Sequence, residues 1–220
     1  MIAYHFCFDL NYYRVLFIDF NNAPFWLGAR AFIVSLFLLL VGVSLHLATR
    51  RGLNWPRYLR RLGLLIAAAA LVSAASYQMF PQTFIYFGIL HFIALASLLG
   101  LAFTRFYWFN LGAGSAAIVA GLLYHSTAFD SRALGWIGFM TFKPPTEDYV
   151  PLLPWFGVVL IGMFFGQWLF NRDPVPRLLR WQATAKGSRL LAFGGRHSLL
   201  IYLLHQPVLL GTLYLIYGPV

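Results

Sequence analysis

Six apolar runs, each about 20 residues long, dominate this sequence. They are Pro24–Leu47, Leu62–Phe80, Phe84–Phe103, Tyr107–Tyr124, Leu152–Phe170 and Ser198–Tyr217. A helix of about 20 residues covers the hydrocarbon core of a bilayer, and only a helix or a closed barrel satisfies its own backbone there. Because these runs are too long for barrel strands, the sequence predicts an all-α, polytopic transmembrane helix bundle with six full spans.

The composition also indicates lipid as the surroundings of the chain. Hydrophobic residues make up 60% of it and charged residues only 10%, whereas a soluble domain carries about 25% charged residues. The net charge is +10, and most of the basic residues lie between the apolar runs. The positive-inside rule therefore explains this charge, and we expect no nucleic-acid partner. The single cysteine, Cys7, excludes an internal disulfide framework, and we expect no metal site.

The charged residues divide the connections between two sides of the membrane. Alternate connections hold Arg50, Arg51, Arg57, Arg60, Arg61, Arg105, Arg172, Arg177, Arg180, Lys186, Arg189 and Arg196. The other connections hold five of the six acids, Asp9, Asp19, Asp130, Glu147 and Asp148. The positive-inside rule therefore predicts a multi-pass protein of a bacterial inner membrane, with cytoplasmic basic loops and a periplasmic C-terminus.

The N-terminal segment Met1–Phe8 is apolar but too short to cross a bilayer, and it reaches Asp9 where an outer loop is expected. We interpret it as the outer half of a further helix, a partial span. The sequence then predicts one transmembrane domain over residues 1–220, truncated at its N-terminus.

His5 and Asp9 are four residues apart and share one face of a helix. A carboxylate at that spacing can hold an imidazole in one tautomer and raise its basicity, as a general base requires. The alternative is a solvated interfacial histidine beside a helix-end acid. We take the two residues as candidate catalytic residues.

Three of the other ionisable residues inside the predicted spans are candidates for function, because such a side chain costs about 2.5–3.5 kcal/mol in a span and is a functional hypothesis by default. His91, seven residues into its span, is a candidate catalytic residue. His205, two residues before Pro207, and Arg30 are candidate substrate-binding residues. The alternatives are an interhelical hydrogen bond for either histidine and an arginine that reaches outward to the interface.

The segment Arg50–Arg61 carries five arginines, which are candidate cofactor-binding residues: Arg50, Arg51, Arg57, Arg60 and Arg61. In one interpretation these arginines set the orientation of the chain in the membrane and attract anionic lipid head groups. They also suit a polyphosphate such as that of coenzyme A, because the planar guanidinium binds phosphate in a forked geometry. Four glycines, Gly112, Gly114, Gly157 and Gly162, are expected to permit close helix packing.

Five stretches together resemble a known family. They are Tyr4-His5-Phe6-Cys7-Phe8-Asp9-Leu10, Phe37 to Leu45, Phe87-Gly88-Ile89-Leu90-His91-Phe92, Asp148 to Gly157, and Gly195 to Pro207. In this order they resemble bacterial members of the heparan-α-glucosaminide N-acetyltransferase catalytic-domain family. The resemblance implies a transmembrane acyltransferase that takes an acetyl group from cytoplasmic acetyl-CoA, as a co-substrate and not a tightly bound cofactor, to a periplasmic sugar amine or hydroxyl. His5 lies in the region of the family's candidate catalytic histidine, although the Asp-x-x-Arg-Gly-like segment that usually leads into the first helix is absent.

Two other function classes stay open. A proton-coupled transporter also uses intramembrane histidines and helices interrupted by residues such as Pro154 and Pro207, and a non-catalytic scaffold subunit is the third interpretation. For an acyltransferase, direct transfer and an acyl-histidine relay are both compatible with the sequence. The expected partners are acetyl-CoA, a sugar or glycan acceptor and membrane lipids, and a homodimer is compatible with the sequence.

Overall fold

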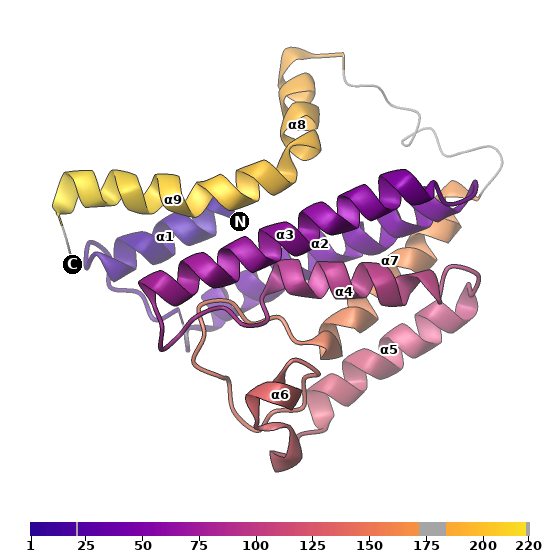
Figure 1. Ribbon diagram of the computed structural model, residues 1–220, viewed down its shortest axis with the longest axis horizontal. Coiled ribbons are helices and arrows are strands. Elements are labelled where there is room, and N and C mark those ends of the chain that lie inside the picture. The colour runs from indigo at the N-terminus through magenta and orange to yellow at the C-terminus, as the bar shows by residue number, and fades with distance from the viewer. Residues whose placement is uncertain (21, 172–183, 219–220) are drawn as a thin grey trace. The chain divides into compact units, whose positions relative to one another are not determined.

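The computed structural model describes residues 1–20, 22–171 and 184–218, and every regular element in these ranges is a helix (Figure 1). The helices are α1 (Ile2–Tyr12), α2 (Pro24–Thr49), α3 (Trp55–Met79), α4 (Ile89–Leu101), α5 (Trp108–Leu123), the 3-10 helix η1 (Thr127–Phe129), α6 (Arg132–Gly135), α7 (Leu152–Phe170), α8 (Lys186–Arg196) and α9 (Ser198–Tyr217). Arg172, Arg177 and Arg180, which were assigned to a cytoplasmic connection, lie outside the described residues.

The packing divides the chain into two compact units. The first unit comprises Met1–Val34 and Arg177–Val220, and the second comprises Ser35–Pro176, so that the division falls within α2. The single domain over residues 1–220 stays a prediction.

A helix forms within each of the six predicted spans. Four of them, α2, α3, α7 and α9, are long and apolar enough to cross a membrane, with 26, 25, 19 and 20 residues. The apolar helices α4 and α5 have 13 and 16 residues, or about 20 and 24 Å at 1.5 Å per residue. The chain is therefore an all-helical, multi-pass membrane protein, with four long candidate spans and two shorter apolar helices.

The starts of α3 and α4 differ from the prediction. The side chain of Asn54 accepts a hydrogen bond from the Arg57 amide (3.1 Å), and Pro56 occupies the first turn. Both features favour a helix start, so α3 begins at Trp55 and not at Leu62. As a result Arg57, Arg60 and Arg61, which were expected on a connection, lie in the first two turns of a helix.

The helix α4 begins at Ile89 and not at Phe84, because the backbone before it bonds to other segments. The Ile85 amide donates to Ser76 Oγ of α3 (3.0 Å), and Thr146 Oγ1 donates to the Phe84 carbonyl (2.9 Å). The segment 84–88 is thus a loop tied to α3 and to the segment 146–150. His91 therefore lies in the first turn of α4 and not seven residues into a helix.

Close glycine contacts hold the second unit together around α7. A Cβ added to Gly114 of α5 would lie 2.8 Å from the Gly157 carbonyl oxygen of α7, and one added to Gly162 would overlap the backbone of Leu39 in α2. The prediction of close packing is confirmed for these three glycines. It is wrong for Gly112, where an added Cβ would meet nothing within 4 Å.

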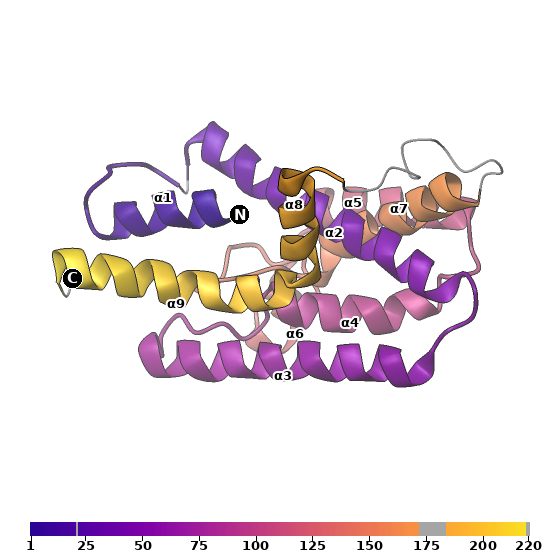
Figure 2. The same ribbon diagram turned by 90° about the horizontal axis from the view of Figure 1, so that it is seen from above.

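In the first unit α1 runs beside α9 (Figures 1 and 2). Phe20, which is buried, packs against the rings of Tyr4 (5.6 Å between centroids) and Trp26 (4.5 Å). These contacts fix α1 against the start of α2. A short helix, α1, thus forms where the sequence predicted a partial span. The face of α1 that carries polar side chains contacts α9.

Candidate active site

Four polar residues meet where α1 packs on α9, and we call them the polar centre: His5 and Asp9 of α1, and His205 and Gln206 of α9. The rings of His5 and His205 are 4.9 Å apart between centroids and meet edge to face. Gln206 Nε2 donates to Asp9 Oδ1 (3.3 Å). The i, i+4 spacing on α1 places His5 and Asp9 on the face that contacts α9.

The polar centre is buried and its hydrogen bonding is incomplete. Asp9 is 2% exposed and His205 is 8% exposed. Among the described residues, Asp9 Oδ2, His205 Nε2 and Gln206 Oε1 are buried without a hydrogen-bond partner. Buried polar atoms are nearly always paired, and each unpaired one costs about 1–3 kcal/mol. Three such atoms in one helix contact make the polar centre the candidate site of this unit.

His91 lies in the second unit, where both of its ring nitrogens have partners. Its Nδ1 accepts from the Gly88 amide (3.3 Å), and its Nε2 is 3.1 Å from Ser73 Oγ. Because the Ser73 hydroxyl donates its only hydrogen to the Ile85 carbonyl (2.6 Å), it accepts from Nε2–H of the histidine. This network joins α3, the loop before α4 and α4 itself. A catalytic role for His91 stays a prediction, and its contacts here are those of a structural histidine.

The half-buried Asp148 supports the same loop. Its Oδ2 accepts from the Ile89 amide at the start of α4 (2.7 Å), and its carboxyl group fills the space where Gly88 has no side chain. Burial raises the pKa of the Asp148 carboxyl, and the bond from Ile89 partly offsets that rise. Next to it Tyr149 donates its hydroxyl to the Gly135 carbonyl (2.6 Å), and burial raises its pKa too.

An open apolar groove of about 530 Å³ lies beside His91. Its lining residues come from α3, the loop before α4, α4 and the segment after α6: Ile66, Ala69, Ala70, Phe87, His91, Ala94, Leu95 and Trp136. The groove and the polar centre belong to different units, so each is a feature of its own part of the chain.

The five arginines of the basic segment differ in their surroundings. Arg50 donates from Nη1 to the Phe170 carbonyl at the end of α7 (3.2 Å), which makes it a structural contact. Arg51, Arg57, Arg60 and Arg61 are exposed. Arg30, the other candidate arginine, is also exposed, on the part of α2 that belongs to the first unit.

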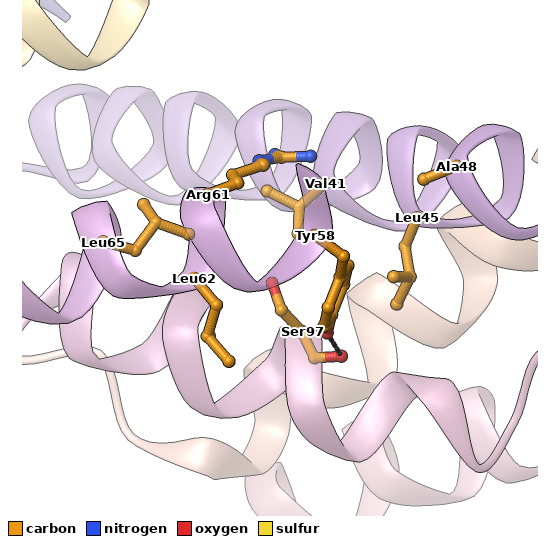
Figure 3. A pocket seen from close by; sticks show the side chains of 8 residues that line it. All are labelled: Val41, Leu45, Ala48, Tyr58, Arg61, Leu62, Leu65 and Ser97. Carbon is orange, nitrogen blue, oxygen red and sulfur yellow. Dashed lines mark hydrogen bonds between the residues drawn. The ribbon is translucent and has the colours of Figure 1, made fainter. Parts of the chain in front are cut away.

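A small pocket lies beside Arg61, between α2, α3 and α4 (Figure 3). In it the Tyr58 hydroxyl donates to the Ser97 carbonyl (2.7 Å). The pocket measures about 10 Å³, which is room for about one water molecule. A polyphosphate bound by these arginines would therefore lie on the exposed surface of the α3 start and not in this pocket.

The comparisons with known proteins give one result for nearly the whole chain. The family model described as heparan-alpha-glucosaminide N-acetyltransferase, catalytic, matches residues 1–207. The chain belongs to this family. Comparisons with curated proteins and with solved structures gave no match. Membership in the heparan-alpha-glucosaminide N-acetyltransferase family confirms the resemblance drawn from the sequence and indicates a membrane acetyltransferase.

The matched range includes all four residues of the polar centre, of which the sequence did not single out Gln206. The sequence feature that could have identified Gln206 is its position as a polar residue between His205 and Pro207 in a largely apolar run. His46, at the end of the predicted span Pro24–Leu47, is buried as well: it is 4% exposed and packs beside Gly166 of α7.

Proposed function

We propose that this protein transfers an acetyl group from cytoplasmic acetyl-CoA to a sugar amine or hydroxyl on the periplasmic side of the membrane, at the polar centre of α1 and α9. Family membership supports the acetyl transfer and acetyl-CoA as the donor. The observation that favours this location is the burial of three unpaired polar atoms, Asp9 Oδ2, His205 Nε2 and Gln206 Oε1, in one contact.

The proposed reaction needs a base and a polar acceptor site. The acceptor nitrogen or oxygen attacks the thioester carbonyl carbon, so that a C–N or C–O bond forms and the C–S bond breaks. The proton of the acceptor passes to a histidine of the polar centre, and coenzyme A leaves as a thiolate that is then protonated. A positioned base of this kind contributes about 10²- to 10⁴-fold to the rate.

We propose that the exposed arginines at the start of α3 bind the phosphates of coenzyme A. Arg57, Arg60 and Arg61 lie at i, i+3 and i+4 and so share one face of the helix. Positive side chains at a helix N-terminus repel the positive end of its dipole. A bound phosphate would remove this repulsion and accept charge-assisted hydrogen bonds.

This donor site predicts an effect on binding and not on chemistry. Replacing both Arg57 and Arg60 by glutamine should raise KM for acetyl-CoA about 10-fold or more, because each lost bond to a charged group is worth about 1.5–3 kcal/mol. The value of kcat should change less than 2-fold, since uniform binding alone is lost. The matched control is Arg105→Gln, an exposed arginine of another connection, for which both constants should be unchanged. Equal KM values for the double variant and the control would contradict the assignment.

The function itself is tested with purified protein and its His5→Ala variant. Binding of acetyl-CoA is measured by calorimetry, and release of free coenzyme A is measured in the presence of glucosamine. We expect binding to survive the substitution and turnover to fall about 100-fold. His125→Ala, at an exposed histidine outside the polar centre, should behave like the unaltered protein. If folded, unaltered protein neither binds acetyl-CoA nor turns it over, the proposed function is wrong.

A further inference from the structure

The hydrogen bonding of His205 determines which of its ring nitrogens carries the proton. His205 Nδ1 lies within hydrogen-bond distance of the Tyr202 carbonyl oxygen, one turn earlier in α9. A carbonyl oxygen can only accept, so Nδ1 carries the hydrogen and donates it. A neutral imidazole has one N–H, and its other nitrogen then holds a lone pair. His205 Nε2 is therefore a basic nitrogen.

That nitrogen is buried and has no hydrogen-bond partner in the part of the chain that the structure describes. Among the described residues no donor reaches His205 Nε2, and the side chain is 8% exposed. Asp9 Oδ2 and Gln206 Oε1 are two more unpaired acceptors in the same contact. Three acceptors without donors match a ligand that brings N–H or O–H groups, as the acceptor of an acetyl group does.

His5 differs from His205 in this respect. It is half-buried, and its ring packs edge to face on those of His205 (4.9 Å between centroids) and Tyr4 (6.1 Å). In the part of the chain that the structure describes, no hydrogen bond fixes the tautomer of its ring. The contacts of His5 position the His205 ring, whereas those of His205 direct a lone pair into the polar centre.

We infer that His205 is the catalytic base, with His5 as its positioning residue and Gln206 as the residue that holds Asp9 by the Nε2–Oδ1 bond. This inference rests on the proposed function. As the acceptor attacks the thioester carbon, its N–H or O–H proton moves to His205 Nε2, and the imidazolium keeps its Nδ1–H bond to the Tyr202 carbonyl. The departing thiolate then takes this proton from His205 Nε2, which gives the free thiol of coenzyme A and restores the neutral imidazole.

The test compares two amide replacements of the same residue in the full chain. In His205→Asn the amide nitrogen takes the position of Nδ1 and keeps the bond to the Tyr202 carbonyl, but the basic nitrogen is lost. We expect kcat to fall about 100-fold or more, with KM for acetyl-CoA within 2-fold and unchanged thermal stability. In His205→Gln neither the base nor the Tyr202 bond is retained, so the same loss of kcat should come with a lower Tm.

Chemical rescue distinguishes a base from a merely structural histidine. It also keeps the inference testable if the amide variants fold poorly. Added imidazole should restore turnover of His205→Gly at least 10-fold, in a saturable manner, and should not restore His5→Gly. Rescue of His5→Gly alone, or unchanged kcat in His205→Asn, would overturn the inference while leaving the proposed function intact. The proposed function fails separately, if the unaltered protein shows no acetyl-CoA-dependent turnover.

Discussion

Replacing Asp9 by asparagine should lower acetyl transfer about 100-fold and raise the free energy of unfolding by about 1 kcal/mol. Asp9 is 2% exposed, and its one hydrogen bond among the described residues comes from the neutral amide of Gln206 at 3.3 Å. A buried carboxylate with so little support destabilises a fold, and stabilising substitutions commonly gain about 0.5–2 kcal/mol, often with a loss of activity. The asparagine can still accept the Gln206 bond, but it cannot carry the negative charge that stabilises a protonated histidine or attracts an ammonium group.

This prediction is checked by measuring kcat and the midpoint of thermal unfolding in detergent on the same preparations. Tyr12→Phe is the matched control, because it removes an exposed hydroxyl from the same helix and should change neither quantity. A variant that loses stability while keeping its activity would show that Asp9 serves the fold and not the reaction.

Replacing Gly114 by valine should lower the thermal midpoint by roughly 2–12 °C. A Cβ at this position would lie 2.8 Å from the Gly157 carbonyl oxygen and 2.9 Å from Ile161 Cγ1, so α5 and α7 must separate. Such overpacking costs about 1–3 kcal/mol, and each kcal/mol corresponds to about 2–4 °C for a chain of this size. Small residues that let helix backbones approach are a main source of packing energy in membranes.

Gly112→Val is the control for this change, two residues earlier in the same helix. An added Cβ there meets nothing within 4 Å. Gly112→Val therefore changes the backbone freedom of the helix in the same way as Gly114→Val, but it creates no clash. Its midpoint should stay the same or rise slightly, because glycine is a poor helix former. Equal losses at Gly112 and Gly114 would contradict the close α5–α7 contact.

The apolar runs predicted the helices well because membrane thickness fixes their length. The bounds of α7 and α9 agree with the predicted spans, Leu152–Phe170 and Ser198–Tyr217. The starts of α3 and α4 could not be predicted in this way. They depend on an Asn54 cap, on a bond from the Ile85 amide to Ser76 and on a bond from Thr146 to the Phe84 carbonyl, and apolar length carries no information about any of them.

The polar centre was only half predictable for a similar reason. The spacing of His5 and Asp9 is local and readable from the sequence, whereas their partners His205 and Gln206 lie about 200 residues later in the chain. The sequence named His205 as a candidate substrate-binding residue, but nothing in the sequence placed it beside His5. The structural contacts of His91 were hidden as well, since its partners Ser73 and Gly88 become recognisable only once the start of α4 is known.

Acetyl transfer across a sealed membrane is the most direct test of a reaction that joins cytoplasmic acetyl-CoA to a periplasmic acceptor at the polar centre. Inside-out vesicles that contain the protein are loaded with glucosamine, and acetyl-CoA labelled in its acetyl group is added outside, on the cytoplasmic face. We expect labelled N-acetylglucosamine to accumulate inside the vesicles. We expect no accumulation with a variant that combines His5→Ala, Asp9→Asn and His205→Asn. Equal accumulation with that variant, or none with the unaltered protein in intact vesicles, would contradict acetyl transfer at the polar centre.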